Sequence, residues 1–288
     1  MFGPLVIAYI FLGGAAGGSL LVASLTDLVR TRTWHRCGNG GEPPRTLIAK
    51  TYVVGLVLLL AALCCLLWDL RQPSRALLVF FMPRPTPLTL GAYTLAMESV
   101  IGCLLASSLI LGRPRQNSRL LLAIEVLCCI VSTVLILYTA FYLISTAVPF
   151  WHNLALPAVF FTSSVSMGLS VFSIVAFSSN ERALEPRTLK VLQSSHLVFL
   201  ILEGISVAAF AAIAWNDPLC QDSIRLLCSP DMLACFLVGA LVMGIAAPLL
   251  IETYSLVVGG GRVLPVCGAL CLCGSLMLRY VIIACGVL

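Results

Sequence analysis

The chain has 288 residues, of which 60% are hydrophobic and only 10% are charged, and its mean hydropathy is +1.06. Soluble domains carry roughly 25% charged residues, so this composition excludes a soluble globular protein. A solvated basic rim on one face of a membrane explains the formal net charge of +5, and no nucleic-acid partner is expected.

Long apolar segments recur along the chain, and each can cross a hydrocarbon core of roughly 30 Å as a helix. Backbone groups in lipid must bond internally, and the alternating pattern of barrel strands is absent. The sequence therefore predicts an all-α integral membrane protein, a single polytopic domain over 1–288. The eight expected spans are 4–25, 47–68, 88–111, 120–144, 156–177, 189–215, 232–258 and 263–287.

Two of these spans are rich in small residues. The first contains the run from Gly13 to Ser19, in which Gly13 and Gly17, and likewise Gly14 and Gly18, are spaced for close helix contact. The fifth contains the run from Ser163 to Gly168. The second span ends in Trp68-Asp69 and the sixth in Trp215-Asn216-Asp217. This repetition favours two four-helix bundles.

Lysine and arginine predict the orientation of the chain. Four lie on one side of the expected spans: Arg71, Arg75, Arg84 and Arg225. Twelve lie on the other: Arg30, Arg32, Arg36, Arg45, Lys50, Arg113, Arg115, Arg119, Arg182, Arg187, Lys190 and Arg262. Because basic residues favour the cytoplasmic side, we expect both termini outside. No small-residue cleavage site follows the first span, so we expect that helix to be retained.

The cysteines and histidines argue against metal centres in this chain. Ten of the thirteen cysteines lie in spans, where a free thiol packs as a small hydrophobe, and their spacing does not match an iron-sulfur cluster. His35 and His152 fall in loops on opposite sides, and only His196 lies in a span, so no bis-histidine haem site can form. Cys220 and Cys228 share an outward loop, and the sequence leaves open whether they are bridged.

Ionisable residues inside the spans are the main functional candidates, because each costs a few kcal/mol at bilayer depth. The alternative is an interior pair that only fixes helix packing. We expect Glu203 near the middle of the bilayer, Asp69, Glu98 and Arg279 toward the outer face, and the remainder toward the cytoplasm. This order would suit a proton pathway formed by Glu98, Glu125, His196, Glu203, Glu252 and Arg279.

Several segments, in order along nearly the whole chain, resemble the NrfD/PsrC-like membrane subunits of polysulfide, tetrathionate and related molybdopterin oxidoreductases and of nitrite reductase systems. The segments are Tyr9 to Gly18, Asp69 to Arg75 with the stretch from Pro83 to Tyr93, Tyr138 to Ser145, Pro149 to Pro157, and Leu276 to Tyr280.

The resemblance implies a haem-free, quinone-reactive subunit of an anaerobic respiratory complex in the cytoplasmic (inner) membrane. It would use menaquinone or ubiquinone and bind a ferredoxin-like four-cluster iron-sulfur subunit, which contacts a molybdopterin or other catalytic subunit. No catalytic residue for the terminal chemistry is expected in this chain. The family's quinone site maps onto Tyr9, Asp69 and Tyr138, although polysulfide reductases have histidine at the position of Tyr9 and asparagine at that of Leu5.

Three further interpretations remain at this stage. Tyr9 and Tyr138 would equally suit an interfacial aromatic belt. Arg71, Arg75 and Arg84 run against the charge bias and are better explained by docking of an outward protein partner. A secondary transporter, or a purely structural anchor, is the alternative function, because buried carboxylates and small-residue helices also occur in transporters.

Overall fold

The computed structural model describes residues 3–33, 45–69, 87–111, 118–146, 148–178, 186–258 and 263–286. All regular elements in these ranges are helical. The first four long helices are α1 (Pro4–Thr33), α2 (Arg45–Asp69), α4 (Pro87–Ile110) and α5 (Ser118–Ile144). The next are α6 (Leu156–Ser178), α7 (Pro186–Asn216), the consecutive segments α9 (Pro230–Ala234), η4 (Cys235–Ala246) and α10 (Ala247–Val258), and finally α11 (Leu264–Gly286).

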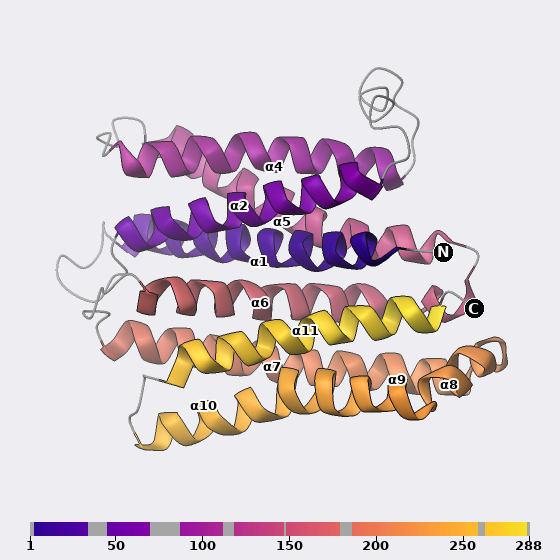
Figure 1. The fold of residues 1–288 in the computed structure, drawn as a ribbon. Coiled ribbons are helices and arrows are strands. Elements are labelled where there is room, and N and C mark those ends of the chain that lie inside the picture. Colours follow the sequence, from indigo (N-terminus) through magenta and orange to yellow (C-terminus); the bar gives the residue numbers. More distant parts are fainter. Residues whose placement is uncertain are drawn as a thin grey trace.

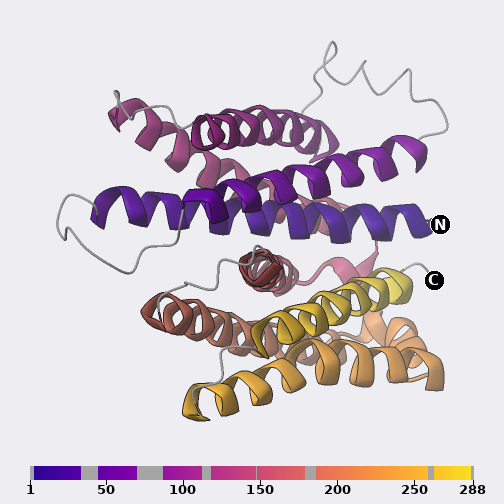
Figure 2. The same cartoon turned by 60° about the vertical axis from the view of Figure 1, so that its left-hand side comes forward.

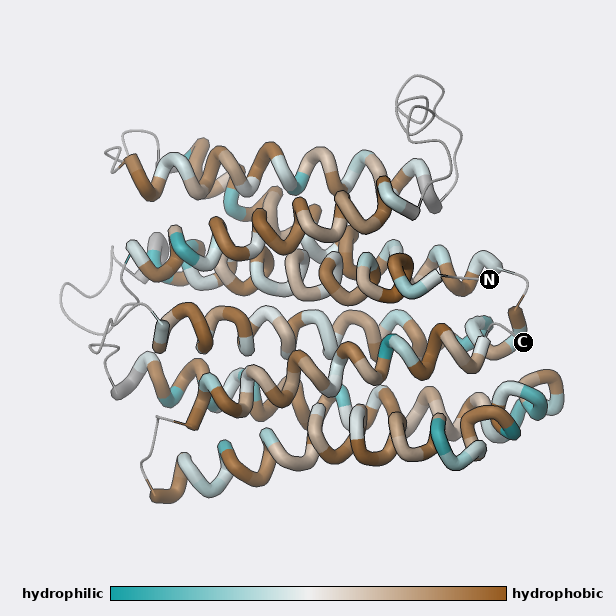
Figure 3. The backbone as a smooth tube through the Cα atoms, viewed as in Figure 1, coloured by the Kyte–Doolittle hydropathy of each residue, from teal (hydrophilic) through white to brown (hydrophobic). Residues whose placement is uncertain are grey.

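Within the described ranges, eight helical stretches are long and apolar enough to cross a membrane. Hydrophobic residues cover their length, and hydrophilic ones are sparse between the helix ends (Figure 3). The predicted all-α integral membrane fold is therefore confirmed. Both termini lie at one end of the bundle, which we call the terminus end, and we call the other the opposite end (Figure 1).

The helices form two groups of four, as the repeated sequence features predict. Helices α1, α2, α4 and α5 pack together, and α6, α7, α11 and the η4 and α10 segments form the second group. The groups meet mainly through α1 and α6, and α6 is seen nearly end-on between α1 and α11 in Figure 2. In the apolar stretches of α1 and α6, 67% and 78% of the residues are buried, so these two helices form the centre of the molecule.

The contact between α1 and α6 depends on glycine. A Cβ atom added to Gly18 would lie 1.9 Å from the carbonyl oxygen of Ser164, and one added to Gly168 would lie 2.2 Å from that of Gly18. Gly17 faces α5 instead, where an added Cβ would meet Ile136 at 3.1 Å. The small-residue pattern thus marks the helix contact that joins the two halves.

We expect Gly18→Ala to destabilise the protein by about 1–3 kcal/mol, because the added methyl group overlaps the backbone of α6 and must push the helices apart. Gly13→Ala is the matched control, since an added Cβ there meets nothing within 4 Å. Thermal unfolding in detergent measures both. A melting temperature equal for the two variants would contradict the contact.

Two helices differ from their expected form. Helix α1 continues to Thr33, well past the expected end of the first span at Leu25. The seventh crossing contains a π-helix from Cys235 to Ala246, whereas π-helices are mostly single-turn bulges. This wider segment packs on α11, where an added Cβ on Gly244 would lie 2.9 Å from the Cα atom of Gly274.

Short elements cover the terminus end of the second half: η2 (Pro149–Trp151), η3 (Pro218–Cys220) and α8 (Gln221–Leu227). Cys220 and Cys228 are not bridged: both are free thiols, the first buried and the second exposed. Burial raises the pKa of the Cys220 thiol, and nearby Asp217 raises it further. Cys228 is therefore the more reactive of the two.

This difference provides a test of the predicted orientation. We expect a membrane-impermeant maleimide added to whole cells to label Cys228, and Cys228→Ser to remove that label. In a variant whose only remaining loop cysteine is Cys37, the maleimide should label the protein only after the cells are opened. The reason is that the loop with Cys37 is predicted on the cytoplasmic side. Labelling of Cys37 in intact cells, without labelling of Cys228, would reverse the orientation.

Candidate functional site

Two of the three predicted quinone ligands lie in the core near the terminus end. Tyr9 on α1 and Tyr138 on α5 are only 9% and 6% exposed, so they do not form a lipid-facing aromatic belt. The ring of Tyr138 packs on Gly91 of α4, where an added Cβ would lie 2.4 Å from a ring carbon. Tyr142, one turn from Tyr138, is close enough to interact electrostatically with Tyr9. Helix α5 thus packs Tyr138 against α4 and places Tyr142, one turn further along, near Tyr9 of α1.

The other residues predicted at this end are only partly described. Asp69 is the last residue of α2, and its side chain lies outside the described part. Arg71, Arg75 and Arg84, the predicted docking residues, follow α2 and also fall outside the described ranges. Their roles stay predictions.

Glu98 lies near the centre of α4, deeper than the outer position expected from the sequence. One carboxylate oxygen accepts a hydrogen bond from the hydroxyl group of Ser132, and the thiol of Cys128 lies 3.8 Å from the same oxygen. The second oxygen is buried without a hydrogen-bond partner among the described residues. Glu98 and Gly91 are two turns apart, so the carboxyl group is about 10 Å from the tyrosines along the helix.

A second polar cluster lies between Glu98 and the opposite end. It contains Glu125 of α5, which was predicted, and Asp27 of α1 and Tyr52 of α2, which were not. All three are buried. The hydroxyl group of Tyr52 interacts electrostatically with Cys128, Asp27 and Glu125, but it has no hydrogen-bond partner in the described ranges. A buried hydroxyl group left without a hydrogen bond costs about 1–3 kcal/mol, so Tyr52 is an unusual residue at this position.

Sequence reasoning missed Asp27 because the first span was expected to end at Leu25. A helix continued to Thr33 places Asp27 and Arg30 on its last turns, and both are buried. Asp27 and Arg30 are three residues apart, which places both on one face of a helix. This spacing, just after the glycine run and the apolar residues of the first span, is the signal that would have found them. Tyr52 gave no comparable signal, because tyrosine near the start of a span is typical of the membrane interface.

Arg279 is the centre of a polar network in the second half. Its two terminal nitrogens donate to the hydroxyl groups of Ser163 and Ser164 at 2.9 Å each, and its guanidinium lies 5.4 Å from the centre of the Phe160 ring. A Cβ atom on Gly14 would approach it to 2.6 Å, so the glycine face of α1 also makes room for this side chain. Serine hydroxyls and an aromatic face therefore hold a fully buried cation.

Glu203 and His196 of α7 continue the network toward the opposite end. Glu203 interacts with the hydroxyl groups of Ser163 and Ser166 and electrostatically with Arg279. Nδ1 of His196 lies 2.6 Å from a carboxylate oxygen of Glu252, and Nε2 lies 3.2 Å from the hydroxyl group of Ser170.

Further contacts complete this part of the network. Ser166 also contacts the thiol of Cys271 at 3.2 Å, and Gln193 donates to the backbone carbonyl of Glu252 at 2.9 Å. The buried carboxylates, the histidine and the arginine thus form one connected set that extends from the level of Cys271 to Arg279, about 12 Å along the axis of α11.

A family model described as polysulphide reductase, NrfD, matches residues 1–288, the whole chain. The protein belongs to the NrfD family. The resemblance found in the sequence is therefore confirmed. The comparison with curated proteins gave no match. NrfD membership makes the chain a multi-pass membrane anchor that associates with catalytic oxidoreductase subunits in a membrane complex.

In this NrfD chain the six predicted proton-pathway residues fall into two networks, one in each half of the molecule. Glu98 and Glu125 belong to the first half. His196, Glu203, Glu252 and Arg279 belong to the second. Helix α1 lies between them, with Gly17 against α5 and Gly14 against Arg279. The structure thus distributes the six residues over two groups on either side of α1, and their role in a proton pathway stays a prediction.

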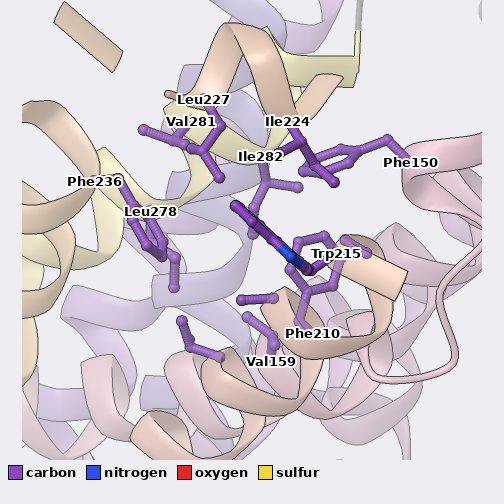
Figure 4. A pocket seen from close by; sticks show the side chains of 13 residues that line it. Phe150, Val159, Phe210, Trp215, Ile224, Leu227, Phe236, Leu278, Val281 and Ile282 are labelled. Carbon is purple, nitrogen blue, oxygen red and sulfur yellow. The ribbon is translucent and has the colours of Figure 1, made fainter. Parts of the chain in front are cut away.

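An apolar cavity of about 50 Å³ also lies in the NrfD chain, at the terminus end of the second half (Figure 4). Phe150, Phe210 and Trp215 form part of its wall, together with Leu278 and Ile282 of α11. Its lining is almost entirely hydrocarbon and aromatic carbon, and the indole nitrogen of Trp215 is the one polar side-chain atom among the lining residues. The tyrosine cluster of the first half is therefore the better candidate for a head group.

Proposed function

We propose that the chain is the quinone-reactive anchor of its complex. It exchanges electrons between menaquinone or ubiquinone in the cytoplasmic membrane and an iron-sulfur subunit of the four-cluster ferredoxin type, which in turn serves a molybdopterin or other catalytic subunit. NrfD membership supports the anchor role. The observation that carries quinone reactivity is the buried pair Tyr9 and Tyr138 at the junction of α1, α4 and α5, with Glu98 two turns deeper.

The chemistry of a quinone matches this arrangement. Conversion of a quinone to a quinol takes two electrons and two protons, so its site needs hydrogen-bond donors for the carbonyl oxygens and a nearby group that exchanges protons. Tyrosine hydroxyls supply the first, and Gly91 fixes the ring of Tyr138 by close packing. We assign proton exchange to Asp69 at the end of α2 and to Glu98 below the tyrosines.

The electron partner is assigned to the terminus end. Arg71, Arg75 and Arg84 stand on this side against the charge bias of the chain, which favours an acidic protein surface as their partner. A cluster docked there would lie on the same side of the bundle as Tyr9 and Tyr138. That placement would keep the distance for electron transfer between the cluster and a quinone at the tyrosines short.

We assign the second-half network to proton translocation. It connects Glu252 near the opposite end to Arg279 nearer the terminus end through His196, Glu203 and intervening serine hydroxyls. Such groups are costly at bilayer depth, and a pure packing role could be filled by apolar residues. The network therefore favours a route for protons that is separate from the quinone site.

Reversal of Arg75 and Arg84 to glutamate should release the iron-sulfur subunit from membranes, and more of it at high salt, because charge attraction is screened. Arg113→Glu with Arg115→Glu is the matched control, since the sequence predicts these two residues on the cytoplasmic side. Immunoblots of washed membranes measure the retained partner. Complete retention after the first reversal would exclude this loop as the docking site.

The proposed function is tested by purifying the complex through a tag on this chain. We expect an iron-sulfur protein to copurify, giving a brown sample whose spectrum lacks a haem Soret band, and a quinone analogue to be turned over. A chain that purifies without a redox partner, or one that moves a solute across liposomes without quinone turnover, would support the transporter alternative instead.

A further inference from the structure

Tyr52 is a buried titratable group that the proposed quinone site does not include. Its side chain is completely buried on α2, in a region where α1 and α2 pack together along their length. The hydroxyl group has no hydrogen-bond partner in the described part of the chain, although a phenol can both donate and accept. A role in stabilising the fold explains this hydroxyl group poorly, because it makes no hydrogen bond to any described neighbour.

The surroundings of this hydroxyl group are acidic and come from two other helices. Asp27 of α1 and Glu125 of α5 interact with it electrostatically, as does the thiol of Cys128. Asp27 and Glu125 lie toward the opposite end, and Cys128 is one turn from Glu125 toward the middle. Tyr52, Asp27 and Glu125 therefore lie at a similar level, each about two turns from the end of its helix at the opposite end, and Cys128 lies one turn closer to the centre of the bundle.

Cys128 links this place to Glu98. Its thiol lies 3.8 Å from a carboxylate oxygen of Glu98, which Ser132 also contacts. Glu125, Cys128 and Ser132 are spaced by three and four residues and share one face of α5. Along this face the groups follow one another from the opposite end to mid-membrane, and the second oxygen of Glu98 is left without a partner in the described structure.

We infer that Tyr52, with Asp27 and Glu125, forms the proton-entry segment of the first half and exchanges the protons of the quinone site with the opposite face. This inference rests on the proposed quinone function. For each quinone reduced, two electrons come from the iron-sulfur partner and two protons travel past Tyr52 to Glu98 and on to the quinone oxygens. Quinol oxidation reverses both flows.

Tyr52→Phe removes the hydroxyl group without removing a hydrogen bond between described residues, so folding should be unaffected. Thr51→Val is the matched control, because Thr51 is equally buried on the same helix but its hydroxyl group donates only to the carbonyl oxygen of Leu47. Asp27→Asn is a second, independent variant of the route.

The test uses the whole complex in liposomes with a pH-sensitive dye enclosed at the opposite face and a soluble quinone analogue as substrate. We expect wild type and Thr51→Val to exchange protons at that face during turnover, and Tyr52→Phe and Asp27→Asn to do so at least tenfold more slowly. The melting temperature of Tyr52→Phe should be unchanged. Wild-type exchange in Tyr52→Phe, or exchange only at the terminus end, would overturn the inference alone. Absence of any quinone turnover in wild type would overturn the proposed function and the inference with it.

Discussion

Tyr138→Phe is expected to lower quinone turnover at least tenfold while the complex stays assembled. The substitution keeps the ring that packs on Gly91 and removes only the hydroxyl group proposed to bind a quinone carbonyl. Asp69→Asn should act similarly, because an amide cannot exchange the proton. Steady-state turnover and the amount of copurified partner are the measurements.

Tyr254→Phe is the control for the loss of a phenol, since Tyr254 is 70% exposed on α10, far from the tyrosine cluster in the fold. It should turn over quinone at the wild-type rate. Wild-type turnover in both Tyr138→Phe and Asp69→Asn would place the quinone pocket elsewhere in the chain.

Arg279→Met is expected to destabilise the protein by about 3–5 kcal/mol, the range for breaking a buried charge interaction by removal of one partner. The guanidinium donates hydrogen bonds to the hydroxyl groups of Ser163 and Ser164, and its positive charge interacts with Glu203. Its loss leaves these buried groups without their main partner. Thermal unfolding in detergent measures the change.

The double variant Arg279→Met with Glu203→Gln separates charge from packing. Because it also removes the carboxylate that the single variant leaves without its counter-charge, it should melt at a higher temperature than Arg279→Met alone. A double variant as unstable as the sum of both single variants would show that Arg279 and Glu203 act independently.

The sequence predicts the membrane fold well, because apolar length and small-residue spacing report directly on lipid contact and helix contact. Of the two glycine pairs expected to pack closely against another helix, Gly14 and Gly18 face Arg279 and Ser164 and Gly17 faces α5, whereas a Cβ on Gly13 would meet nothing within 4 Å. The π-helix from Cys235 to Ala246 could not be predicted in this way. Every residue in it is apolar or glycine, so the pattern of hydrophobicity is the same for an α-helix and a π-helix.

The candidate sites were predicted less completely, for a physical reason. Hydropathy locates charges inside a span, and so it found Glu98, Glu203 and Arg279, but it does not tell which helices pack together. The division of these charges between the two halves follows from the position of α1 between α5 and α6. Asp27 was missed because hydropathy falls at Leu25 although the helix continues to Thr33.

The central claim is that this chain carries electrons between quinone and an iron-sulfur partner. Its most direct test is to reduce the clusters of the purified complex chemically, mix it rapidly with a quinone analogue without oxygen, and follow cluster absorbance. We predict that the clusters are reoxidised in wild type and at least tenfold more slowly in Tyr138→Phe. Clusters that stay reduced in the presence of excess quinone would contradict the account.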